Sequence, residues 1–154
     1  MSAGRLEQVA SVLGRHFAIA GESERAVHYF KMAGEQAAQA FANEEAISSF
    51  RSALEIVQDE PNNEVMARVL AGLWTKLAEV LWATWRLGEA REAFQTAIGL
   101  VGPDDALQGA HLYALLGKLE RDDHSHNAAL AAFDAAEELP GERPWDKGDV
   151  WADV

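Results

Sequence analysis

The chain has 154 residues, which suits one compact domain or three to four short helical repeats. Its 25 acidic and 13 basic residues give a formal net charge of −12, which argues against nucleic acid or an anionic membrane as the main partner. The lack of cysteine excludes disulfide scaffolds, thiolate zinc sites and cysteine nucleophiles. No apolar stretch approaches the ~18 residues of a membrane span, and the first residues lack the apolar core of a signal peptide, so we expect a cytoplasmic protein.

The predicted elements are all helices, because alanine, leucine, glutamate and glutamine dominate and no segment alternates as a strand does. Gly21 and Gly88 predict turns. Asp104 or Asp105 predicts the N-cap of the sixth helix. In chain order we expect seven helices, over residues 5–19, 23–41, 44–58, 64–86, 88–100, 105–121 and 127–138.

A pattern of alanine, phenylalanine and alanine recurs four times along the chain. The second and third residues follow the first at i+4 and i+7, which places all three on one stripe of a helix. Small residues let a neighbouring helix approach closely, and the ring fills the gap between helices. The instances are Ala26–Phe30–Ala33, Ala46–Phe50–Ala53, Ala90–Phe94–Ala97 and Ala129–Phe133–Ala136.

A glycine or alanine inside the helix upstream of each stripe is the second recurring feature. Glycine in mid-helix costs about 1 kcal/mol relative to alanine, so its presence indicates close contact between helices. The first two stripes follow one another too closely for two separate hairpins, whereas the later stripes are spaced more widely than the usual repeat. We therefore expect helix 23–41 to be shared between the first two hairpins. The upstream positions are Gly14, Gly34, Ala78 and Gly117.

Together these motifs resemble the tetratricopeptide repeat, a helix–turn–helix unit of about 34 residues. The resemblance covers residues 6–140 and implies an all-α, right-handed superhelix of helical hairpins. We expect residues 1–140 to form this repeat domain and residues 141–154 to be a tail or the start of a further, truncated helix.

The N-terminal third carries a more specific resemblance, in the segments 16–18, 21–29, 33–37 and 42–47. They are similar to the helical-repeat region that follows the ATPase module in large bacterial signalling proteins, where the ATPase is joined to a nucleotide cyclase or a DNA-binding regulator domain. The resemblance implies a regulatory, partner-binding or self-association role. The chain has no phosphate-binding loop of its own, so the ATPase module is not part of it.

Residues of a concave groove follow from the resemblance to the repeat family, which takes an extended peptide or a helix there. Trp82 falls about 100° off the packing stripe of Trp74, Leu77 and Leu81, which suggests an exposed hot spot, although Trp82 could instead pack on helix 105–121 or on the tail. Trp85 is expected to be buried. The predicted groove residues are Ser11, Arg15, Thr75, Glu79, Trp82, Lys118 and Arg121.

The tail changes character after Leu139 and Pro140, and it carries Trp145 and Trp151 in what reads as the opening of another amphipathic helix. This pattern suggests an excised piece of a longer protein, or else a short capping helix folded onto the last repeat. Solenoids need polar caps, and Leu139, Trp145 and Trp151 would leave apolar surface at this end. We therefore predict self-association, with a homodimer as the simplest form.

Catalytic and metal-binding motifs are weak throughout. Asp122, His124 and His126 form a run that could bind zinc or nickel, but catalytic zinc needs three convergent ligands with supporting contacts. We predict no catalytic residues, no metal and no cofactor. The predicted function is a non-enzymatic scaffold module that binds a protein or peptide within a larger bacterial signalling or transcription regulator. Two alternatives are a sensory domain enclosing a small molecule or an inhibitory segment, and a metal-dependent enzyme built on this run.

Overall fold

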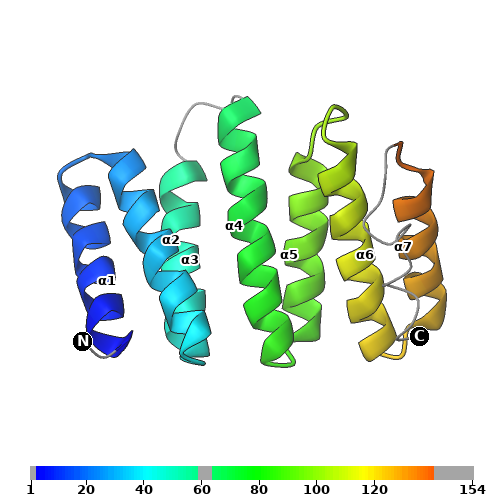
Figure 1. Ribbon diagram of the computed structural model, residues 1–154, viewed down its shortest axis with the longest axis horizontal. Coiled ribbons are helices and arrows are strands. Elements are labelled where there is room, and N and C mark those ends of the chain that lie inside the picture. Colours follow the sequence, from blue (N-terminus) through cyan, green and yellow to red (C-terminus); the bar gives the residue numbers. More distant parts are fainter. Residues whose placement is uncertain (1–2, 59–63, 141–154) are drawn as a thin grey trace. The chain divides into compact units, whose positions relative to one another are not determined.

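A computed structural model describes residues 3–58 and 64–140 of the chain, which form helices joined by turns and short connections (Figure 1). The described part contains no strand, and the seven expected helices are confirmed with shifts of up to three residues at their ends. The helices are α1 (Ala3–Ile19), α2 (Ser23–Gln39), α3 (Asn43–Gln58), α4 (Glu64–Ala83), α5 (Leu87–Leu100), α6 (Ala106–Asp122) and α7 (His126–Glu138). None of them is long and apolar enough to cross a lipid bilayer.

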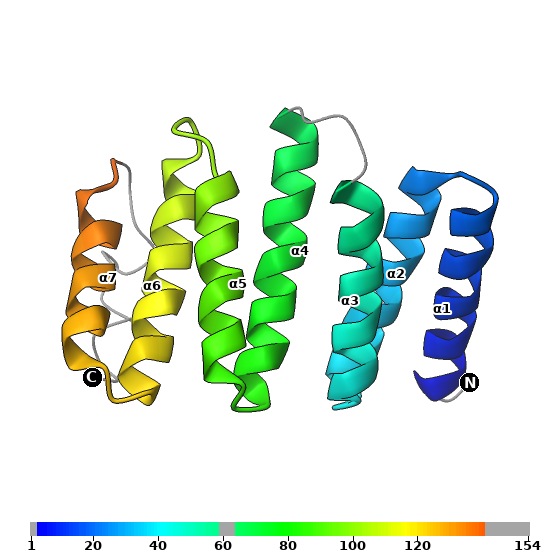
Figure 2. The same cartoon turned by 180° about the vertical axis from the view of Figure 1, so that it is seen from behind.

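The described residues form two compact units, one with α1 to α5 and the other with α6 and α7. In the first unit α2 packs on both α1 and α3, α3 packs on α4, and α4 packs on α5. In the second unit α6 and α7 form one antiparallel hairpin, which Figure 2 shows from behind. The side chain of Asp105 accepts a hydrogen bond from the backbone N–H of Gln108, which confirms an N-cap at the start of α6.

A glycine pressed against a phenylalanine ring is the contact that repeats between paired helices. A Cβ on Gly14 would lie 2.9 Å from the Phe30 ring. A Cβ on Gly34 would lie 2.7 Å from the Phe50 ring, and this close approach explains why helical glycines are found here. Since α2 supplies both Phe30 and Gly34, its predicted sharing between two hairpins is confirmed.

The same contact closes the second unit, where a Cβ on Gly117 would lie 2.7 Å from the Phe133 ring. The interval along the chain between the glycine and its phenylalanine is the same in all three contacts, and Ala78 stands at this interval before Phe94 between α4 and α5. Ala78 and Phe94 are both fully buried. The two sequence motifs are therefore the two halves of one interhelical contact.

Four hairpin turns share one backbone geometry. At the first, the N–H of Glu22 donates to the carbonyl of Phe17 and the N–H of Gly21 donates to that of Ala18, the pair of bonds that defines a Schellman motif. The turns after α2, α4 and α6 repeat both bonds. Each turn has one residue in the left-handed conformation, and in chain order these residues are Gly21 (φ 76°), Phe41 (φ 58°), Trp85 (φ 58°) and His124 (φ 60°).

Two expectations about the turn after α4 were wrong. Trp85 was expected inside a helix and buried, but α4 ends at Ala83 and Trp85 is 70% exposed. Gly88 was expected in a turn, but it lies in the first turn of α5. The left-handed residue is fixed by its distance along the chain from Phe94, which equals that of Gly21 from Phe30, and not by the nearest glycine.

Replacing Gly34 by alanine tests the repeated contact between a helical glycine and a phenylalanine ring. In Gly34→Ala the added methyl would meet the ring of Phe50, a residue that is only 1% exposed. We expect overpacking of about 1–3 kcal/mol to outweigh the gain of about 1 kcal/mol in helix propensity. Gly72→Ala on α4 is the matched control, because no atom lies within 4 Å of its added Cβ, and it should stabilise the chain. Urea unfolding of the two variants checks this, and equal stabilisation by both would contradict it.

Candidate partner-binding clefts

Two clefts in the first unit contain three of the predicted groove residues. The first cleft lies between α1 and α3 and has a volume of about 540 Å³. Ser11 and Arg15 line it from α1, opposite Glu45 and Ser48 of α3. Every lining residue except Val12 carries a polar group, with one cation and two carboxylates among them, while the aliphatic parts of these side chains form most of the surface. Such a surface is suited to hydrogen bonding and ion pairing with an incoming chain. The residues that line it are Gln8, Ser11, Val12, Arg15, Glu44, Glu45, Ser48 and Ser49.

The second cleft lies between α2 and α4 and has a volume of about 280 Å³. Glu79 lines it from α4, and Gln39 lines it from α2. Lys76 crosses the cleft, with its Nζ 3.2 Å from the Oε1 of Glu35. Both side chains of this ion pair are more than a third exposed, so the pair contributes little to stability and remains open to exchange with a ligand.

Thr75 and Trp82 are held by contacts within the first unit. The Thr75 hydroxyl donates a hydrogen bond of 2.7 Å to the Ala71 carbonyl on the same helix. Trp82 is half-buried and meets Phe94 of α5 edge to face, with ring centroids 6.2 Å apart. Neither residue is among those lining the two clefts.

The remaining predicted site residues belong to the second unit or lie beyond the described residues. Lys118 and Arg121 are half-buried on α6. Leu139 packs against the buried alanines 110, 114 and 136, and its Cδ1 would be 3.2 Å from a Cβ on Gly109. Trp145 and Trp151 lie outside the described residues.

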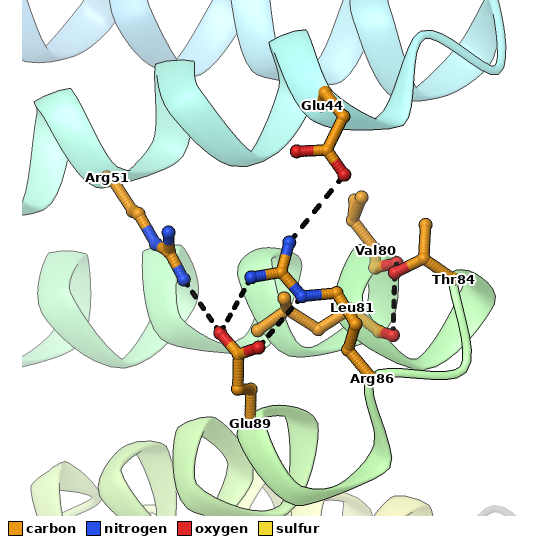
Figure 3. Close-up of polar contacts among 7 residues, drawn as sticks. All are labelled: Glu44, Arg51, Val80, Leu81, Thr84, Arg86 and Glu89. Atoms are coloured by element: carbon orange, nitrogen blue, oxygen red, sulfur yellow. Dashed lines mark hydrogen bonds and ion pairs between the residues drawn. The ribbon is translucent and has the colours of Figure 1, made fainter.

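An ion-pair cluster ties α3 to the turn before α5 (Figure 3). Arg86 donates two hydrogen bonds to the Glu89 carboxylate, from Nε at 2.8 Å and from Nη2 at 2.9 Å. Arg51 of α3 donates to the same carboxylate at 2.9 Å, and Glu44 of α3 lies 3.7 Å from Arg86. The hydrogen bond from Arg86 is the main reason that the pKa of Glu89 is lowered, and it also raises the pKa of Arg86.

The run at Asp122, His124 and His126 spans the turn between α6 and α7, and His124 is exposed in the left-handed conformation. Nowhere in residues 3–58 and 64–140 do three or more histidine, aspartate or glutamate side chains gather as a metal site would require. Buried, convergent ligands with supporting contacts are what a metal-dependent enzyme needs.

Comparison with known proteins points to the fold alone. No protein-family model matches the chain, and no curated protein sequence matches it. A crystal structure of MamA, a tetratricopeptide-like helical repeat protein, superimposes with a TM-score of 0.56 at 17% identity, covering 86% of this chain and 77% of that one. The chain has an all-α, tetratricopeptide-like fold.

Two further structures are similar at 17% identity. MamA 41-end from Desulfovibrio magneticus RS-1 covers 96% of this chain and 99% of its own, with a TM-score of 0.40. The MamA RS-1 ArsTM double mutant covers 90% and 96%, with a TM-score of 0.39. The tetratricopeptide-like fold is one on which interaction surfaces vary independently of the scaffold, so the site must be argued from its own residues.

Two exposed aromatic residues escaped the sequence reasoning. Phe41 and Trp85 are 86% and 70% exposed in their turns. Their common offset from the repeat phenylalanine, shared with Gly21, was the signal that could have placed them in turns.

The ion-pair cluster predicts a pH dependence of stability. Because the folded pKa of Glu89 lies below its ordinary value of 4.5, the cluster stabilises the fold above that value and loses this contribution as pH falls through the lowered pKa. The free energy of unfolding should therefore differ between wild type and Glu89→Gln near pH 7, and the difference should vanish in strong acid. Urea titrations at several pH values measure it, with Glu92→Gln on the same helix as control. A difference that grows on acidification would contradict this assignment.

Proposed function

We propose that this chain is a non-enzymatic scaffold module that binds a protein or peptide through the clefts of its tetratricopeptide-like fold. The observation that carries the proposal is the pair of clefts between α1 and α3 and between α2 and α4, each lined by charges of both signs. Exposed charges of both signs on facing helices suit an extended or helical segment of another chain.

The character of these clefts favours a macromolecular partner over the alternative, a sensory domain that encloses a small molecule. Small-molecule sites are lined mainly by apolar and aromatic side chains with a few polar groups. The cleft between α1 and α3 has no aromatic side chain, and seven of its eight lining residues carry polar groups, including one cation and two carboxylates.

The wider setting belongs to the same proposal. The resemblance of the N-terminal third to the repeat regions of bacterial ATPase-linked regulators supports a place in such a signalling or transcription protein, in the cytoplasm. The predicted groove residues Lys118 and Arg121 would form a separate binding surface on the second unit.

Self-association through the C-terminal end, at Leu139, Trp145 and Trp151, is also part of the proposal. Leu139 already packs into the core of the second unit, so Trp145 and Trp151 would have to supply most of the contact. A homodimer formed in this way should dissociate when both tryptophans are replaced by serine, as measured by sedimentation equilibrium.

Selection from a displayed library of random peptides tests the binding function. We expect enriched peptides to bind the wild type, and to bind the charge-reversed variant Arg15→Glu/Glu79→Lys at least about tenfold more weakly. Arg68→Glu is the control, because Arg68 is exposed on α4 and does not line either cleft. Circular dichroism verifies that all variants remain helical. Enriched peptides that bind the charge-reversed variant as well as the wild type, or a failure to enrich any peptide, would contradict the proposal.

A further inference from the structure

Two large aromatic side chains occupy a backbone position where the fold favours glycine. The first hairpin turn places Gly21 in the left-handed conformation, and the equivalent residues of the next two turns are Phe41 and Trp85. A non-glycine residue is strained in this conformation, and such strain, which persists only where the surrounding structure enforces it, is found most often at functional sites. The fold itself does not require the rings, because they project from the turns with most of their surface in solvent.

Phe41 and Trp85 belong to one edge of the first unit. The turn from α2 to α3 and the turn from α4 to α5 lie at the same ends of their helices in both views, opposite the turn that follows α1 (Figures 1 and 2). Arg86, in the turn before α5, lies 3.7 Å from Glu44 at the start of α3 and so links the two turns. The Thr84 hydroxyl donates hydrogen bonds to the Val80 and Leu81 carbonyls and holds the end of α4 (Figure 3). The two rings therefore project from turns that are connected by an ion pair.

Two exposed glutamates follow Phe41 along the chain. Glu44 is 78% exposed, and Glu45 beside it is exposed as well. Arg86, which follows Trp85, is already held by Glu89 and Glu44. An apolar pair with an acidic border complements a surface with apolar side chains and flanking lysine or arginine, and it repels an anionic membrane.

We propose that Phe41 and Trp85 form the anchor of a second docking surface, which takes a protein segment carrying apolar side chains flanked by basic residues. Aromatic side chains with an acidic rim bind such a segment by burying its apolar groups and pairing its cations with Glu44 and Glu45. The surface adjoins the cleft between α1 and α3 through these two glutamates, so it rests on the proposed function and adds the chemistry of the partner.

Glycine substitution separates a docking role from a structural one. In Phe41→Gly/Trp85→Gly the left-handed backbone becomes unstrained and the net charge is unchanged, so the midpoint of thermal unfolding should stay the same or rise. If the rings instead support the fold, the midpoint falls, and this result would overturn the proposal.

Binding is measured with two synthetic amphipathic helices, one of leucine and lysine and the other of leucine and glutamate. By fluorescence anisotropy we expect the leucine–lysine peptide to bind the wild type and to bind the double glycine variant about tenfold or more weakly. The leucine–glutamate peptide should bind neither. Ile19→Ala, which removes an exposed apolar side chain at the opposite edge, should bind as the wild type does.

Three outcomes would overturn the proposal. Equal affinity of the leucine–lysine peptide for the wild type and the double glycine variant would show that the rings are not the anchor. Binding to phosphatidylserine vesicles that depends on Trp85 would assign the edge to a membrane. Library peptides that depend on Arg15 and Glu79, together with no binding of the leucine–lysine peptide, would remove this surface and leave the proposed function standing.

Discussion

The contact of a helical glycine with a phenylalanine ring sets the geometry of every hairpin that it closes. A Cβ at Gly34 or Gly117 would lie 2.7 Å from the partner ring, so the two helix backbones are as close as the ring permits. The constant interval along the chain between glycine and ring also fixes the turn between them, because each Schellman motif falls near the middle of the same segment. Helix approach, turn geometry and the start of the next helix thus follow from one pair of residues.

That constraint leaves the left-handed residue of each turn free to vary in its side chain but not in its backbone. Gly21 meets the backbone requirement without strain, whereas Phe41, Trp85 and His124 accept it at a cost of about 1–2 kcal/mol each. A position whose backbone is dictated by packing elsewhere and whose side chain points to solvent is well suited to carry a binding group. Within one such residue, the backbone belongs to the scaffold and the side chain is available for an interaction surface.

Sequence reasoning reached the fold because its signals are local. The stripes from Ala26, Ala46, Ala90 and Ala129 and the upstream glycines are short-range patterns, and the short interval between the first two stripes predicts that α2 is shared. It missed Trp85 because helix propensity and apolar spacing continue past Ala83, while the end of α4 is set by the hairpin contact with Phe94. The clefts were only partly predictable: Ser11, Arg15 and Glu79 line them, but Trp82 packs on Phe94, a contact between helices that no spacing rule along α4 contains.

The coupling between the glycine and the ring can be measured directly with a double-mutant cycle of Gly34→Ala and Phe50→Leu. The free energies of unfolding of the wild type, both single variants and the double variant come from urea titration. We predict that Gly34→Ala destabilises the chain when Phe50 is present and is neutral or stabilising when leucine replaces the ring, with a coupling energy of about 0.5–3 kcal/mol. Additive effects of the two substitutions would contradict a direct coupling between Gly34 and Phe50.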